Sequence, residues 1–188
     1  MTDQIGITRP VVPLAGDETE TLLAALERER DIFAWKCGGL RGPDLRATLG
    51  PSRITLGGLL KHLALVEDDY FSVRLLGQEL GPPWSSVDWE ADRDWEWHSA
   101  AKDSPEQLMR LWQEAVTRSR AAVDQILASS GPGGPLDQHA RYTNEVGESP
   151  TLRRILVDMV EEYARHNGHA DLIRESVDGL VGEDPPAR

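Results

Sequence analysis

Apolar residues recur at helical spacing in four segments of the chain, at approximately residues 17–37, 55–76, 104–129 and 150–177. Within each segment they fall three or four positions apart, which places them on one face of an α-helix. The alternating patterns that indicate strands are nearly absent. Because every apolar face must be buried against another, the economical arrangement is a four-helix bundle. We therefore predict an all-α fold in which a single domain spans residues 1–188.

Capping signals flank the predicted helices. Asp17 and Glu20 have the spacing of a capping box at the start of the first helix. Gly77 provides a C-terminal stop for the second helix. Ser-Pro pairs at 104–105 and 149–150 supply an N-cap, followed by proline at the first helical position, for the third and fourth helices.

The connection between the second and third helices, residues 77–103, is longer than a compact domain normally leaves unstructured. It contains four of the six tryptophans, which are Trp84, Trp89, Trp95 and Trp97. Two interpretations are open. The indoles either cover the side of the bundle as a packed segment, or they form the wall or lid of a binding pocket.

Composition narrows the classes of function. With a net charge of −12, the chain lacks the basic surface that binding to nucleic acid requires. It has no run of about 18 apolar residues that would span a bilayer, and residues 1–20 lack the regions of a secretory signal, so we expect a cytoplasmic protein. The single cysteine, Cys37, is expected to be buried and inert. We expect small molecules as partners rather than nucleic acid or a membrane. Pairing of two copies through an exposed helix face is also compatible with the sequence.

Three of the five histidines lie on predicted helix faces. His62 falls within the apolar stripe of the second helix, while His166 and His169 are three positions apart in the fourth. A step of three residues turns an α-helix by about 300°, so these two imidazoles lie about 60° apart on one face. Glu162 lies on the same face, one turn before His166. A lone histidine on an apolar face is usually a hydrogen-bonded core residue, but three converging imidazoles with an open position are typical of a catalytic metal site.

Two segments carry a family resemblance. "LGGLLKHLALVEDDYF" and "LVDMVEEYARHNGHADLIRESVDGL" hold the motifs G-L-x-K-H-L-A and E-E-x-A-R-H-x-G-H-A-D. In order and spacing these motifs resemble the DUF664, or mini-circle protein, branch of the DinB superfamily, over roughly residues 20–180. The resemblance implies helices arranged up-down-down-up. It also implies a divalent metal, with zinc or nickel the best match to imidazole ligands, held by one histidine of the second helix and two residues of the fourth.

Carried over to this chain, the resemblance implies His62, His166 and His169 as the metal ligands. The commonest superfamily pattern spaces the two ligands of the fourth helix four residues apart. The position four residues before His169 is occupied by Arg165, which cannot bind a metal, so His166 is the expected replacement. Asp158 lies two turns before His166 and would at most serve in an outer shell.

The function implied by the resemblance is thiol chemistry, because characterised relatives resemble enzymes that use mycothiol, bacillithiol or glutathione. We expect a divalent-metal-dependent S-transferase that joins a low-molecular-weight thiol, as cosubstrate, to a small electrophilic substrate. A bound metal acidifies a thiol at neutral pH, and Glu162 is expected to orient a ligand imidazole or to move a proton. The alternative is a metal- or ligand-binding stress-response protein without turnover, which a fourth protein ligand on the metal would favour.

The remaining polar candidates have structural explanations. His98 and His139 lie in polar connections and are expected at the surface. Arg174 is expected to be a solvated salt-bridge partner on the fourth helix. The glycines inside the predicted helices, including Gly58 and Gly168, are expected to mark close packing or a cap.

Overall fold

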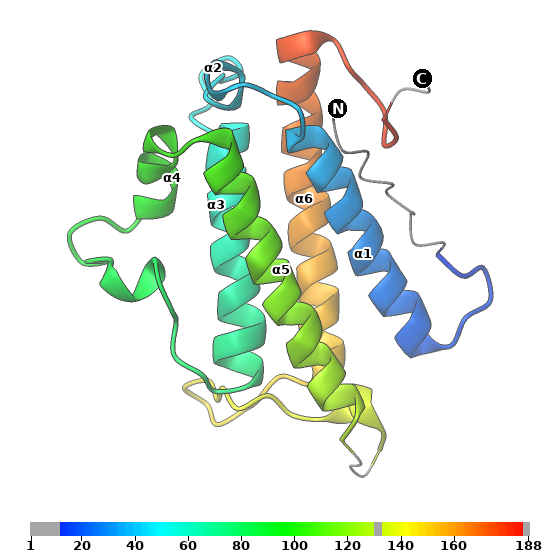
Figure 1. Ribbon diagram of the computed structural model, residues 1–188. Helices are drawn as coiled ribbons and strands as arrows, with labels where there is room; N and C mark the ends of the chain where they lie inside the picture. Colours follow the sequence, from blue (N-terminus) through cyan, green and yellow to red (C-terminus); the bar gives the residue numbers. More distant parts are fainter. Residues whose placement is uncertain (1–11, 130–132, 186–188) are drawn as a thin grey trace.

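Four long helical stretches form the body of the molecule (Figure 1). They are α1 (Glu18–Cys37), α3 (Leu56–Glu67) with its π-helical continuation η1 (Asp68–Leu75), α5 (Pro105–Leu127) and α6 (Leu152–Asp178). The computed structural model describes residues 12–129 and 133–185, and no strand occurs in those two ranges. The predicted all-α four-helix bundle is confirmed.

The helices follow the predicted up-down-down-up order. In the view of Figure 1, α1 and α6 run upward, whereas α3 and α5 run downward. The helix α1 packs along α6, and α3 packs along α5, so each of these pairs is parallel. Their apolar faces meet in one core, to which the four helices contribute Phe33, Leu59, Trp112 and Met159, among others.

The parallel course of α3 and α5 explains the long connection between them. Since α5 has 23 residues and is therefore about 35 Å long, the chain must return along nearly the whole bundle before α5 begins. Residues 76–104 make this return beside α3 (Figure 1). The returning segment contains three short helices, η2 (Trp84–Ser86), α4 (Trp95–Ser99) and η3 (Ala100–Lys102). Two further short helices, α2 (Gly42–Leu45) and η4 (Pro135–Asp137), lie in the other connections.

Two of the predicted N-terminal caps are confirmed as capping boxes. At α1, the Asp17 side chain accepts a hydrogen bond from the Glu20 backbone N–H, and the Glu20 carboxylate accepts one from the Asp17 N–H. At α5, Ser104 and Gln107 exchange the same pair of bonds. The first turns of both helices therefore have partners for donors that would otherwise be unsatisfied.

The predicted start of the fourth helix is wrong. The helix α6 begins at Leu152 with Thr151 as its N-cap, not at the Ser-Pro pair of residues 149–150. The physical reason is that the Pro150 carbonyl accepts a 2.8 Å hydrogen bond from the Ala140 N–H. This pairing with the preceding connection keeps the chain extended up to the cap.

A buried polar network joins the four long helices. The guanidinium of Arg30 on α1 donates two hydrogen bonds, of 2.8 and 2.6 Å, to the carboxylate of Glu67 on α3. The Tyr163 hydroxyl on α6 donates to the same carboxylate at 2.6 Å and accepts a 2.8 Å bond from the Trp112 indole on α5. Because a buried charge is costly unless it is paired and hydrogen-bonded, the network favours one register of the helices.

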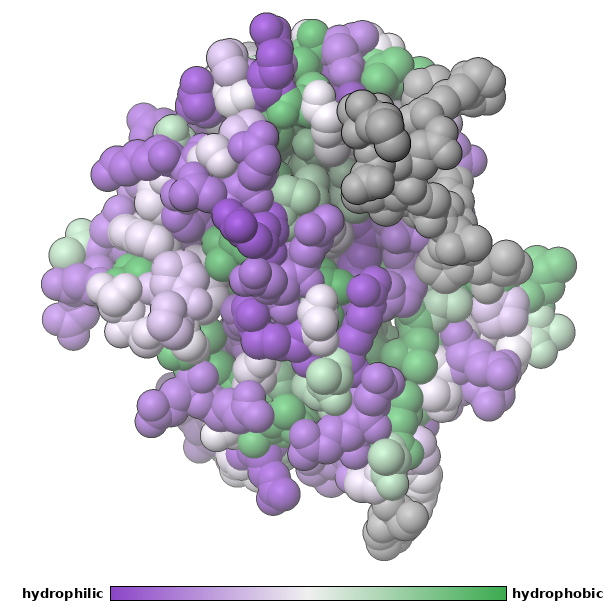
Figure 2. Space-filling model, in the orientation of Figure 1, coloured by the Kyte–Doolittle hydropathy of each residue, from purple (hydrophilic) through white to green (hydrophobic). Residues whose placement is uncertain are grey.

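The outer surface matches the acidic composition. The face shown in Figure 2 is mainly hydrophilic, and its apolar residues occur in small separate groups. Within the described ranges, no helix combines the length and the apolar character that crossing a membrane would need.

Candidate metal centre

Two histidines and one glutamate meet where α3 faces α6. His62 extends from α3, and Glu162 and His166 lie four residues apart on one face of α6. The Nε2 atom of His62 lies 3.2 Å from Glu162 Oε1, and Nε2 of His166 lies 3.1 Å from the same oxygen. Two imidazole nitrogens from different helices therefore converge on one carboxylate oxygen.

The donor atoms of this trio fit a divalent metal. His62, Glu162 and His166 each offer one ligand atom, and the three atoms lie within 4.8 Å of one another. Imidazole nitrogen and carboxylate oxygen are the ligands that zinc and neighbouring first-row metals accept. A set of three such ligands leaves a coordination position for a further molecule, which is the pattern of a catalytic site.

His169 lies next to this trio, on the opposite side of the His166 ring. Its Nδ1 atom is 3.3 Å from Nδ1 of His166, whereas the Nε2 atom of His166 faces Glu162. One imidazole binds an ion through one nitrogen, so an ion at Nε2 of His166 would be reached by His169 only after a side-chain rotation. The structure thus brings together His62 and His166 with Glu162, and the role of His169 as a ligand stays a prediction.

The electrostatics of the trio favour an ionised carboxylate. Hydrogen bonds from His166 and His62 hold the pKa of Glu162 far below its usual range, outweighing the opposing effect of burial. Burial lowers the pKa of His62, but its hydrogen bonds with Glu162 and Glu96 outweigh burial and raise it. Burial, together with the charges of His166 and Arg165, lowers the pKa of His169. A lowered pKa favours the neutral imidazole, which is the form that binds metals.

A second carboxylate, which the sequence analysis did not single out, contacts the other nitrogen of His62. The Oε1 atom of Glu96 on α4 lies 3.3 Å from Nδ1 of His62. Glu96 is only 6% exposed, and its Oε2 atom is buried without a hydrogen-bond partner among the described residues. A carboxylate on Nδ1 fixes the ring so that Nε2 faces the ligand side, an arrangement common in metal sites. The only signal in the sequence was its place between Trp95 and Trp97 in the long connection.

Trp97 forms one wall of the site. Its indole stacks on the His62 imidazole, with ring centroids 4.7 Å apart and planes inclined by 27°. Gly58 permits this approach, because a Cβ atom at that position would lie only 2.6 Å from Trp97 Cε3. The close-packing interpretation of Gly58 is therefore confirmed.

The other three tryptophans of the connection pack among themselves and against the bundle. Trp84 is buried and donates a 2.8 Å hydrogen bond to Asp68 Oδ2. Trp84 and Trp89 each contact Trp95 edge-on, with ring centroids 6.3 Å apart. Trp84 and Trp89 thus cover the side of the bundle, whereas Trp97 contacts the candidate metal centre, and its role as the wall of a binding pocket there stays a prediction.

All three residues of the trio lie within the part of the chain that one family profile matches. The profile described as mycothiol-S-transferase matches residues 21–179. The chain belongs to the mycothiol S-transferase family. This family is DinB-like, so the predicted superfamily is confirmed, and the DUF664 branch is compatible with it. Comparisons with curated proteins and with solved structures gave no match.

In this member of the mycothiol S-transferase family, the residues between the two histidines of α6 have separate roles. The Asn167 amide donates hydrogen bonds of 2.9 and 2.7 Å to the carbonyl and carboxylate of Glu29, which ties α6 to α1. At Gly168 an added Cβ would meet no atom within 4 Å. The close-packing interpretation of Gly168 is therefore wrong. Asp158, considered for an outer shell, forms an ion pair with Arg154 instead.

The remaining predictions have mixed outcomes. His98 and His139 are exposed, as expected. Cys37 is buried, and burial raises the pKa of its thiol well above the usual range, although the charge of Arg174 opposes this. The prediction that Arg174 is solvated is wrong. Its side chain is buried and donates hydrogen bonds to the backbone carbonyls of Lys36 and Gly38, because carbonyls at the C-terminal end of α1 need donors. The predicted salt bridge is present, with Asp178 as the partner.

Proposed function

We propose that the protein is a divalent-metal-dependent S-transferase that joins mycothiol, or a related low-molecular-weight thiol, to a small electrophilic substrate. The observation that carries this proposal is the convergence of His62 Nε2 and His166 Nε2 on Glu162 in a chain of the mycothiol S-transferase family. We further propose the cytoplasm as its location, because mycothiol-type thiols act in a reducing compartment and the chain has a single cysteine.

The metal would be held by His62 and His166, with a third ligand from α6. Glu162 suits that third position because its carboxylate oxygen already lies within 4.8 Å of both imidazole ligand atoms. His169, the third ligand expected from the resemblance, competes for the same role after a rotation of its side chain. The mixed nitrogen and oxygen donors are compatible with zinc or nickel. When bound, such a metal lowers the pKa of a thiol, so that a thiolate is available at neutral pH.

The reaction needs a thiolate sulfur to form a bond to an electrophilic carbon, while the leaving group departs with its electron pair. Glu162 is better suited to hold or orient than to accept the thiol proton, because its lowered pKa makes it a weak base. Glu96 keeps the His62 ring in its orientation through Nδ1. Trp97, stacked on the same ring, excludes water from that side of the site.

Assays of the metal-reconstituted protein with mycothiol, bacillithiol and glutathione against 1-chloro-2,4-dinitrobenzene test the proposal. We expect thiol consumption that requires the metal, that favours mycothiol and that His62→Ala abolishes, with His98→Ala as the matched surface control. Stoichiometric metal binding without turnover for any of the three thiols would favour the non-catalytic binding protein. Failure to bind zinc or nickel would overturn the metal-dependent S-transferase and the metal-binding form of the alternative.

A further inference from the structure

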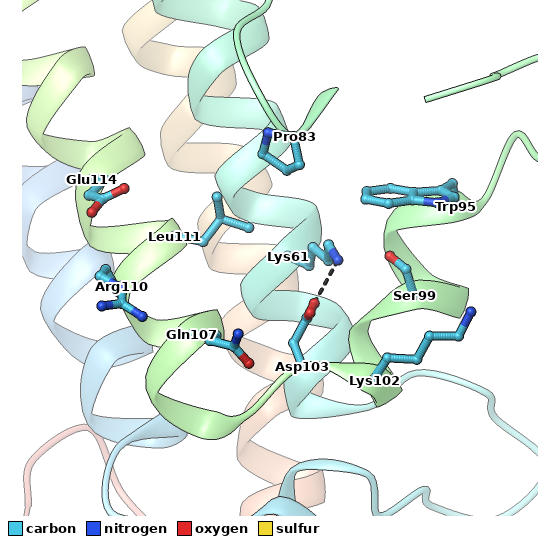
Figure 3. A pocket seen from close by; sticks show the side chains of 10 residues that line it. All are labelled: Lys61, Pro83, Trp95, Ser99, Lys102, Asp103, Gln107, Arg110, Leu111 and Glu114. Atoms are coloured by element: carbon cyan, nitrogen blue, oxygen red, sulfur yellow. Dashed lines mark hydrogen bonds and ion pairs between the residues drawn. The ribbon is translucent and has the colours of Figure 1, made fainter. Parts of the chain in front are cut away.

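A cavity separate from the candidate metal centre lies between α5 and the returning segment, on the side of α3 away from α6. It has a volume of about 470 Å³, within the usual range for small-molecule sites. Figure 3 shows Lys61 of α3 at its floor, Trp95 and Ser99 of α4 on one side, and Arg110 and Leu111 of α5 on the other.

The helix α4 separates this cavity from the candidate metal centre. Trp95 and Ser99, one turn apart on α4, line the cavity. Glu96 and Trp97 contact His62 instead. The cavity and the metal centre are therefore two sites that share one short helix as a partition.

The α4 side of the cavity carries a buried hydroxyl that lacks a hydrogen-bond partner among the described residues. Ser99 is 8% exposed, and its Oγ atom finds no hydrogen-bond partner in the described part of the chain. In Figure 3 this hydroxyl and the Lys61 ammonium face the same space, beneath the Trp95 indole. Buried polar atoms are almost always hydrogen-bonded, so such an atom on a cavity wall indicates a missing polar ligand.

Lys61 supplies a positive charge beside that hydroxyl. It is 4% exposed, its Nζ atom donates a 2.6 Å hydrogen bond to Asp103 Oδ2, and it lies 4.3 Å from the centroid of the Trp95 ring. An ammonium group has three donors, so the bond to Asp103 leaves donors for a ligand.

The lining as a whole is weakly positive in a strongly acidic protein. Its cations are Lys61, Lys102 and Arg110, and its anions are Asp103 and Glu114, which leaves a surplus of one positive charge. The net charge of the whole chain is −12, so the lining of the cavity has the opposite sign to the protein as a whole. The two carboxylates would repel a dianion such as phosphate, whereas a single negative charge matches the surplus.

The remaining lining is apolar. Trp95, Leu111 and Pro83 present an indole, an aliphatic side chain and a proline ring to the same cavity. An indole face and aliphatic groups favour a ligand with a ring or a short hydrocarbon body.

We propose that this cavity binds a small monocarboxylate with an apolar body, whose carboxylate accepts hydrogen bonds from Ser99 Oγ and Lys61 Nζ while its body packs against Trp95. The exposed guanidinium of Arg110 on the opposite wall adds long-range attraction for the anion. This site is independent of the metal centre and of the S-transferase activity.

Binding of benzoate to the purified full-length chain, measured by isothermal titration calorimetry, tests the proposal, with benzamide as the uncharged analogue and inorganic phosphate as the competing anion. We expect benzoate to bind at least tenfold more tightly than benzamide, and phosphate to compete poorly. Equal binding of benzoate and benzamide, or displacement by phosphate at equal concentration, would overturn it.

Ser99→Ala separates ligand binding from folding. Removing a buried hydroxyl that has no partner should leave thermal stability unchanged or raise it, while weakening benzoate binding about tenfold through the lost hydrogen bond. Arg110→Gln, at an exposed position that folding does not depend on, should weaken benzoate severalfold, and the exposed control Arg93→Gln should not. His62→Ala should leave benzoate binding unchanged. Benzoate affinity indifferent to both Ser99→Ala and Arg110→Gln would refute the assignment.

Discussion

Glu96 and His62 are in contact through Oε1 and Nδ1 at 3.3 Å, although 34 positions separate them in the chain. The contact places the carboxylate behind the imidazole and turns Nε2 toward Glu162. We expect Glu96→Gln to fold normally but to weaken metal affinity about 10- to 100-fold, because the amide orients the ring less firmly and does not raise its basicity. Competition with a fluorescent chelator measures this affinity, and Glu90→Gln is the exposed control in the same segment. An unchanged affinity would show that Glu96 serves packing alone.

The identity of the third ligand is tested by a set of alanine variants. We expect the wild-type protein to bind about one divalent ion per chain, and His62→Ala and His166→Ala should each remove most of this metal, as measured by elemental analysis. If Glu162 completes the set, Glu162→Ala should do the same and His169→Ala should retain metal. The reverse result would identify His169 as the third ligand. His98→Ala and His139→Ala should keep full occupancy, since both positions are exposed.

A matched pair of glycine substitutions tests how Trp97 reaches His62. Gly58→Ala should cost about 1–3 kcal/mol of unfolding free energy, because the new Cβ would lie 2.6 Å from Trp97 Cε3 and force overpacking. Gly168→Ala, in the interior of α6 with no atom within 4 Å of the new Cβ, should stabilise the protein by about 0.5–1 kcal/mol. Urea unfolding gives both values. The Gly58→Ala spectrum should also show altered tryptophan fluorescence, and an unaltered spectrum with unchanged stability would mean that Trp97 does not occupy this position.

Breaking the buried ion pair of Arg30 and Glu67 should cost more unfolding free energy than breaking an ion pair at the surface. Arg30→Met leaves the fully buried carboxylate of Glu67 without its charge partner, for an expected loss of about 3–5 kcal/mol. The comparison is Arg28→Met, which breaks an exposed pair with Glu183 and should cost less than about 1 kcal/mol. Equal losses in urea unfolding would contradict the burial argument.

Cys37 should be unreactive in the native protein. Burial raises the pKa of its thiol, so that the thiolate required for reaction is scarce at pH 8. Ellman's reagent should therefore detect no thiol before denaturation and one per chain in guanidinium chloride. Rapid reaction of the native protein would indicate that the end of α1 opens readily.

The fold was accessible from the sequence because its determinants are local. Helical spacing and capping residues such as Asp17 and Ser104 act within a few positions, and the structure confirms them. The proximity of Glu162 to His166 follows in the same way from a step of four residues on one helix.

Contacts across the long connection could not be predicted in this way. Nothing in local spacing indicates that Glu96 and Trp97 reach His62, since the path of the returning segment is set by the packing of α4 on α3. The side-chain rotamers decide whether Glu162 or His169 lies nearer to His62, and helical periodicity does not predict rotamers. The error at the start of α6 has a similar origin, because a tertiary hydrogen bond at Pro150 overrides a good local cap signal.

The parallel course of α3 and α5 also has an evolutionary consequence. A bundle with this order of helices needs a returning segment in any case, and here that segment supplies a wall of each of the two sites, Trp97 for one and Trp95 for the other. Insertions and substitutions in the return can therefore alter the choice of substrate while the two histidines stay fixed on α3 and α6. Diversity among relatives of this chain should accordingly concentrate between residues 78 and 102 rather than in the four long helices.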